Sequence, residues 1–82
     1  MTLTELARRT PAIVEAVEDR TPDDPIARRL RELGFVVGEQ VEVVAAGPFG
    51  AEPLLVQVGF TRFALRRAEA ARVRLRTNGA GA

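Results

Sequence analysis

The 82-residue chain contains no cysteine, histidine, tryptophan or tyrosine, and all twelve of its basic residues are arginine. These absences exclude disulfide bonds, metal sites built from thiolate or imidazole, and catalysis by a cysteine or histidine. The net charge is only +1, but residues 1–61 carry six arginines against ten acids, whereas residues 62–82 carry six arginines against one glutamate. The length predicts one small domain, whose C-terminal part is basic.

The first predicted element is a short helix over residues 3–9. Thr2 and Glu5 have the spacing of a capping box, in which each satisfies the other's free backbone N–H group. Leu3 and Leu6 would form the buried face of this helix.

Residues 12–18 are ambiguous in their apolar spacing. Val14 and Val17 are three positions apart, which fits neither strict alternation nor a long helix. We predict a strand with a bulge near Glu15 or Ala16, because one extra residue restores the apolar side chains to one face.

The clearest helix signal covers residues 25–33. Asp24 is suited to accept hydrogen bonds from the first free N–H groups, and Pro25 suits the first helical position. Gly34 is placed where a left-handed residue ends a helix. One apolar stripe follows the helical period and comprises Ile26, Leu30 and Leu33.

The rest of the chain alternates apolar and polar residues as β-strands do. The alternation predicts strands over residues 41–45, 54–60, 63–65 and 73–75. Residues 47–53 contain two glycines and two prolines and predict a turn, and residues 61–62 predict a tight connection. Residues 67–71 predict a single 3₁₀ turn.

Five short strands and two helices, at residues 3–9 and 25–33, predict a mainly β fold, a small SH3-like five-stranded barrel. Closing the barrel would remove the exposed strand edges. The domain is expected to span residues 2–76, followed by a flexible tail over residues 77–82. The inside face is predicted to consist of Val14, Val17, Val41, Val43, Val56, Val58, Phe63, Leu65, Val73 and Leu75.

Several short stretches also occur in an order typical of one family. They are Leu3-Thr4-Glu5-Leu6, Arg29-Leu30-Arg31-Glu32-Leu33-Gly34-Phe35, Gly38 with Val41–Val43, Gly47-Pro48-Phe49-Gly50, Pro53–Val58 and Phe63–Ala70. This series resembles the bacterial ferrous iron transport protein A family, the FeoA domain, over residues 2–76.

The resemblance implies a cytoplasmic accessory protein without enzymatic activity or cofactor. Its partner would be the cytoplasmic domain of a FeoB-type membrane transporter for ferrous iron, which would recruit it to the inner membrane. The docking surface is expected to join aromatic side chains, which supply buried area, with arginines that steer towards an acidic partner. Its predicted residues are Pro48, Phe49, Gly50, Phe60, Arg62 and Arg66.

Two other functions remain open. Arg72, Arg74 and Arg76 alternate on the last strand and would suit a phosphate backbone, although no aromatic residue for base stacking interrupts this row. A homo-oligomeric interaction module, such as a homodimer, is the other, because Leu54 and Leu55 in succession place one leucine on the outer face.

Catalysis, tight metal binding and membrane insertion are the least favoured. The sequence has no nucleophile elbow and no phosphate-binding loop, and no apolar run approaches the about 20 residues of a membrane span. The carboxylates of Asp19, Asp23 and Asp24, or of Glu39 and Glu42, could gather around a cation. A solvated acidic loop in which Asp24 caps the helix is the simpler interpretation, so no catalytic residue and no metal site is expected.

Overall fold

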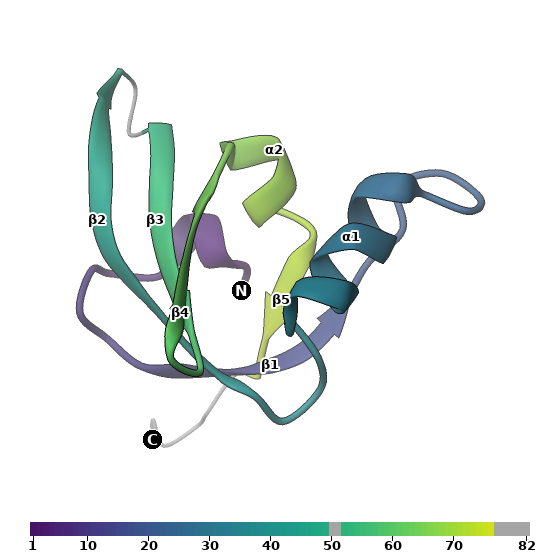
Figure 1. Cartoon of the computed structure of the whole chain (residues 1–82), viewed down its shortest axis with the longest axis horizontal. Coiled ribbons are helices and arrows are strands. Elements are labelled where there is room, and N and C mark those ends of the chain that lie inside the picture. Colours follow the sequence, from purple (N-terminus) through teal and green to yellow (C-terminus); the bar gives the residue numbers. More distant parts are fainter. Residues whose placement is uncertain (50–51, 77–82) are drawn as a thin grey trace.

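The structure is a computed structural model that describes residues 1–49 and 52–76. Figure 1 shows how its helices and strands are arranged. In chain order they are η1 (Leu3–Glu5), β1 (Ala12–Val17), α1 (Pro25–Leu33), β2 (Gln40–Phe49), β3 (Glu52–Val58), β4 (Thr61–Leu65), α2 (Arg67–Ala70) and β5 (Val73–Leu75). None of the helices in the described ranges is long and apolar enough to cross a bilayer.

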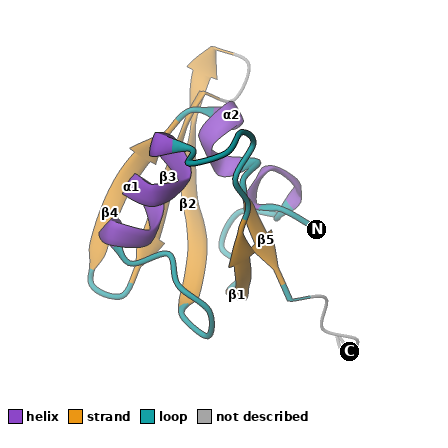
Figure 2. Ribbon diagram, turned by 90° about the vertical axis from the view of Figure 1, so that its right-hand side faces the viewer, coloured by secondary structure: helices purple, strands orange, loops and turns teal. Residues whose placement is uncertain are grey.

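The five strands form one antiparallel sheet in the order β4-β3-β2-β1-β5. Figure 2 shows β1 and β5 standing apart from β4, with α1 in front of the β3–β4 part of the sheet. The mainly β, five-stranded fold is therefore confirmed. The register of β1 against β5 shifts between Val14 and Ala16, which confirms the predicted bulge.

The sheet does not close into a full barrel. Strands β4 and β5 are at opposite ends of the order, and no ladder joins them in the described part of the chain. The expected pairing of the two edges is therefore not seen among the described residues. Helix α1 lies beside this gap: Asp24 at its start is bonded to Arg72 next to β5, and its side chains share a groove with β4.

Helix α1 has the predicted bounds and caps. The Oδ1 atom of Asp24 accepts hydrogen bonds from the N–H groups of Ile26 (3.0 Å) and Ala27 (3.4 Å), which satisfies two donors of the first turn. At the other end Gly34 has φ +117°, a conformation that side chains disfavour. The N–H of Phe35 then donates to the Leu30 carbonyl (3.1 Å) as the chain leaves the helix.

The first helix is shorter than predicted. It ends at Glu5 rather than at residue 9, and Leu6 is already extended, with φ −78° and ψ 130°. The Thr2 N–H donates to Glu5 Oε1 (2.7 Å), as the capping box requires. The Arg9 N–H donates to the Val43 carbonyl (2.9 Å), so the chain turns towards β2 instead of completing a second helical turn.

The boundaries of four later elements also differ from the prediction, and β4 begins at Thr61 rather than at residue 63. Strand β2 continues through Pro48, where its register with β3 shifts. Proline is tolerated there because a residue at such an irregularity need not donate an N–H group to the neighbouring strand. Strand β3 ends at Val58, and the turn to β4 consists of Gly59 and Phe60, in which Gly59 adopts the positive φ of +60° that a two-residue hairpin needs first. The four residues of α2 form an α-helical turn rather than a 3₁₀ turn.

The core lies between the curved sheet and the helices. Most of the predicted inside face is buried, while Val17 and Phe63 are half-buried and pack against the core from its periphery. Phe35 is fully buried and its ring centre is 6.2 Å from that of Phe63, at an interplanar angle of 52°. This tilted aromatic pair joins the end of α1 to β4.

Candidate functional site

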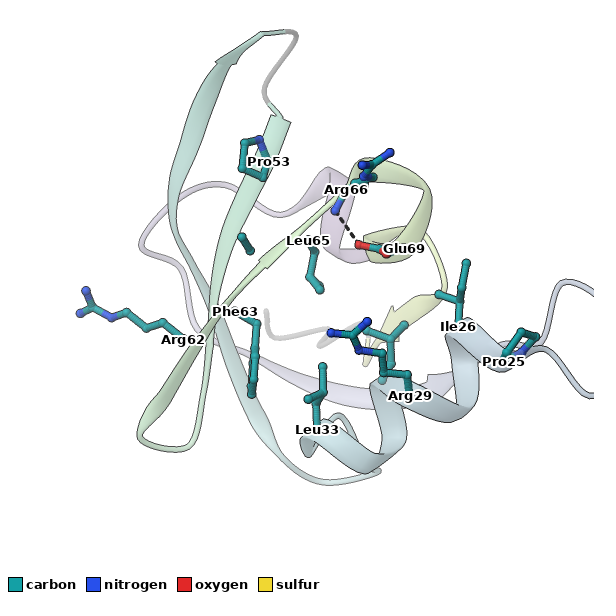
Figure 3. Close-up of a pocket in the computed structure, with 12 residues that line it drawn as sticks. Pro25, Ile26, Arg29, Leu33, Pro53, Arg62, Phe63, Leu65, Arg66 and Glu69 are labelled. Carbon is teal, nitrogen blue, oxygen red and sulfur yellow. Dashed lines mark hydrogen bonds between the residues drawn. The ribbon is translucent and has the colours of Figure 1, made fainter.

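A groove with a volume of about 740 Å³ separates α1 from β4. Three apolar residues of α1, Ile26, Leu30 and Leu33, lie along one wall. Phe63 and Leu65 of β4 lie along the other, and Figure 3 shows both side chains pointing towards α1. The groove is therefore an apolar channel between a helix and the terminal strand of the sheet.

Charged side chains surround this channel. Arg29 of α1 extends over it and Arg66 stands at one end of β4, whereas Arg62 points away on the outer face of the sheet (Figure 3). Glu69 is the one carboxylate among the lining residues, and its Oε1 atom accepts a hydrogen bond from the Arg66 backbone N–H (2.8 Å). In the described residues no carboxylate lies within salt-bridge distance of Arg29 or of Arg66. The groove therefore has a positive rim.

The predicted docking residues divide between the two ends of β3. Pro48 is exposed in β2 near one end, while Gly50 and the side chain of Phe49 lie outside the described residues. Phe60 is at the other end, in the β3–β4 turn, and its side chain is fully exposed (105%). A strand of seven residues separates these ends, which corresponds to about 20 Å.

The two predicted arginines lie on the β4 side of the molecule. Arg62 lies two residues after Phe60, and its Nε atom donates a hydrogen bond to Gln57 Oε1 (3.0 Å). Arg66 follows the last residue of β4, near Pro53 at the far end of the same groove. The described members, Pro48, Phe60, Arg62 and Arg66, are thus spread over both ends of β3, and the part of the six predicted residues in docking remains a prediction.

The contribution of α1 to this site was not evident from the sequence. Arg29 was not singled out as a site residue, and Ile26 and Leu33 were recognised only as members of the apolar stripe of the helix. Ile26 is 36% exposed and Leu33 is only half-buried. The stripe itself gave no signal of a groove, because Ile26, Leu30 and Leu33 recur at the ordinary spacing of a half-buried helix.

The arginine row of β5 is largely occupied within the molecule. The Nε atom of Arg72 donates to Asp24 Oδ2 (2.8 Å), and this pair is nearly buried, with side-chain exposures of 11% and 3%. Arg74 pairs with Glu18 (2.7 Å), which raises the pKa of its guanidinium, first through that hydrogen bond and then through the charges of Glu18 and Glu15.

Asp24 connects three segments of the chain. Besides the two N–H groups of α1 and the Arg72 guanidinium, it accepts the Arg20 N–H (2.9 Å). These donors hold the pKa of its carboxyl well below the ordinary value of 3.8, with the Arg72 hydrogen bond as the largest cause. Asp24 is therefore a structural carboxylate that ties the acidic loop, α1 and β5 together.

The other acidic residues of the loop also have arginine partners. Asp19 pairs with Arg31 (3.1 Å) and Asp23 with Arg28. Within residues 1–49 and 52–76, no three residues of the types His, Cys, Asp and Glu lie close enough together to hold a metal ion. The loop carboxylates thus serve ion pairs and a helix cap.

Comparison with known proteins identifies the family. The FeoA domain model matches residues 1–77. FeoA of Stenotrophomonas maltophilia is 66% identical, with a TM-score of 0.86, over 93% of this chain and 89% of that one. That protein was crystallised with zinc and is described as an SH3 domain protein suggested to act as a bacterial ferrous iron transport activating factor.

Two more distant structures have the same fold. Iron(II) transport protein A from Clostridium thermocellum is 28% identical, with a TM-score of 0.81, over 96% of this chain and 46% of that one. FeoA from Chlorobium tepidum is 29% identical, with a TM-score of 0.75, over 92% of this chain and 68% of that one. No curated protein is similar enough to be matched with the chain. The fold is thus SH3-like, and the chain belongs to the FeoA family.

Proposed function

We propose that this protein is a non-enzymatic accessory factor of bacterial ferrous-iron uptake. The observation that carries the proposal is the match of the FeoA domain model to residues 1–77. The S. maltophilia protein, at 66% identity, adds the suggested role of a ferrous iron transport activating factor. At this identity, surface residues as well as the core are shared, so a common role is the simplest assignment.

The partner in this proposal is the cytoplasmic domain of a FeoB-type transporter. The protein would act in the cytoplasm and reach the inner membrane through that partner. Support comes from the composition of the surface: a fully exposed phenylalanine and an apolar groove with a positive rim are features of protein-interaction sites.

Calorimetric titration of the protein into the cytoplasmic domain of the same organism's transporter tests this proposal. We expect saturable binding, measured once with GDP and once with a non-hydrolysable GTP analogue. A difference between the two nucleotides would add regulation by the nucleotide state. Absence of binding with both nucleotides would overturn the proposed partner.

An uptake assay tests the accessory role separately. Deleting the gene for this chain should reduce uptake of radioactive ferrous iron, and a plasmid copy should restore it. Unchanged uptake in the deletion strain would contradict the proposal even if the two proteins bind one another.

A nucleic-acid-binding role is the weaker candidate. Arg72 and Arg74 of the predicted row are already paired with Asp24 and Glu18, which leaves Arg76 as the row's member without a carboxylate among the described residues. Any binding to DNA or RNA should therefore be weak and should show a shallow dependence on salt. Homodimer formation stays a prediction, which sedimentation equilibrium would test.

A further inference from the structure

Two backbone positions of strand β4 have no hydrogen-bond partner in the described part of the chain. Val58 and Thr61 close the two-residue hairpin, so their N–H and C=O groups face one another, and the pattern then alternates along the strand. The N–H and C=O groups of Arg62 and Ala64 consequently point away from β3. No described residue forms a backbone hydrogen bond with either of them, because β4 is the last strand of the sheet.

The side chains beside this edge alternate in character. Phe63 and Leu65 point inwards and form a wall of the apolar groove, whereas Arg62 and Ala64 are exposed on the outer face. An additional strand along this edge would have the same two faces. Its inward residues would lie in the groove and its outward residues would lie beside Arg62.

The charges of the arginines around the groove indicate which kind of segment binds along the β4 edge. Arg29 and Arg66 at the rim have no carboxylate partner among the described residues, and Arg62 carries a further positive charge along the same edge. A second copy of the chain is a poor occupant, because antiparallel pairing of two β4 strands would bring the arginines of one protomer against those of its partner.

We propose that the β4 edge and its groove bind an extended segment of a partner protein in which carboxylate side chains alternate with apolar ones. The segment joins the sheet as a sixth strand, so its backbone satisfies the free groups of Arg62 and Ala64. Its apolar side chains fill the groove, and its outward carboxylates lie beside Arg62, within the positive field to which Arg29 and Arg66 also contribute. The inference rests on the proposed function only for the identity of the partner, the cytoplasmic domain of the transporter.

Amide hydrogen exchange, followed by NMR, measures strand addition directly. The probe is an N-acetylated, C-amidated peptide in which glutamate alternates with valine, added at millimolar concentration. Exchange of the Arg62 and Ala64 amides should slow about tenfold when the edge is occupied nine-tenths of the time. Unchanged exchange at both amides overturns the inference, and so does equal slowing by a peptide in which lysine replaces glutamate.

Two pairs of variants separate the contributions of the backbone and the charge. Ala64→Pro removes one outward N–H at a position where an edge strand tolerates proline, and should weaken binding of the glutamate peptide about fivefold. Ala64→Thr keeps the N–H and should bind as the native protein does. Arg62→Gln should weaken binding about threefold, whereas Arg8→Gln, an exposed arginine elsewhere, should not.

The variants remain decisive if one of them fails to fold. Circular dichroism identifies an unfolded Ala64→Pro protein, and the arginine pair then carries the test. Binding of the folded Ala64→Pro protein with native affinity overturns the inference.

The same exchange measurement with the transporter's cytoplasmic domain separates the two proposals. Protection of Arg62 and Ala64 by that domain supports both. Protection by the peptide, with no binding of the domain, supports the edge site and overturns the proposed partner. Binding of the domain while both amides exchange freely overturns the edge site and leaves the proposed function intact.

Discussion

The two edge strands of the sheet, β5 and β4, differ in whether another segment of the chain covers them. At β5 the N-terminal segment covers the edge: Thr2 forms a bridge with Arg74, and the Leu75 N–H donates to the Met1 carbonyl (2.8 Å). At β4 the outward groups of the strand have no backbone partner among the described residues. An uncovered edge strand can pair with a strand of another chain. Because the β5 edge is covered, such pairing is restricted to the β4 edge.

The ion pairing of the arginines also differs between the β5 side and the β4 side of the molecule. On the β5 side Arg72 and Arg74 are paired with carboxylates, Arg72 in the nearly buried contact with Asp24, and Arg76 alone of that row has no such partner among the described residues. The arginines near β4 lack such partners in the part of the chain that the structure describes. The comparison indicates that the β5 side is built for stability, whereas the β4 side keeps its charge available for other molecules.

Replacing Leu3 should produce the largest loss of stability, because this residue anchors the cover of β5. Its side chain is 1% exposed, and η1 contacts both β5 and α2. We expect Leu3→Ala to cost about 3 kcal/mol in the free energy of unfolding, measured by urea denaturation. The half-buried Leu6 is the control, and Leu6→Ala should cost less; equal costs would mean that η1 does not hold the edge.

Acid should weaken the Asp24–Arg72 contact. Because the pKa of Asp24 is lowered in the folded protein, its stabilising contribution is complete above the ordinary pKa of 3.8 and declines as the pH falls below that value. Thermal unfolding should show Asp24→Asn to be about 10 °C less stable than the native protein at neutral pH, with the difference narrowing in acid. Asp23→Asn, an exposed neighbour, is the matched control; a similar loss in that variant would refute the special role of Asp24.

Substituting Gly59 tests the hairpin that presents β4. Its φ of +60° favours glycine, and no atom lies within 4 Å of the place where a Cβ would be. Gly59→Ala should therefore cost about 1 kcal/mol through the backbone alone, measured by urea denaturation. A loss several times larger would mean that the turn also fixes the register of β4.

Removing the exposed aromatic ring should have the smallest effect. Phe60 is fully exposed, so Phe60→Ser should change the free energy of unfolding by less than about 0.5 kcal/mol. Phe63→Ala, on the groove wall, should be clearly less stable by the same measurement. If Phe60→Ser unfolds as readily as Phe63→Ala, the ring packs against the protein in solution and cannot serve as an exposed contact.

Local chemistry made much of the fold predictable. The bounds of α1 follow from Asp24, Pro25 and Gly34, each of which acts on backbone groups within a few residues. The bulge in β1 follows from the spacing of two valines. The first helix was overextended because the contact that ends it, from Arg9 to the Val43 carbonyl, joins residues far apart in the sequence.

The candidate site was less accessible to sequence reasoning. Phe60 and Arg62 were recognised by their residue types, but the groove is formed by α1 and β4, which are separated by two strands. Arg72 and Arg74 could be read as a free basic row, because their partners Asp24 and Glu18 lie about 50 positions away. Oppositely charged residues that pair in the folded protein can be far apart in the sequence, so the sequence pattern does not reveal that they pair.

By itself the sequence determined the short-range features of this protein: a capped nine-residue helix, alternating strands, glycine turns and a composition that leaves out thiol and imidazole chemistry. The tertiary structure alone decided which sheet edge is covered, which arginines are paired and where the groove lies. The physical reason is that caps and turns depend on backbone groups a few residues apart, whereas edge pairing, salt bridges and grooves depend on which distant segments meet.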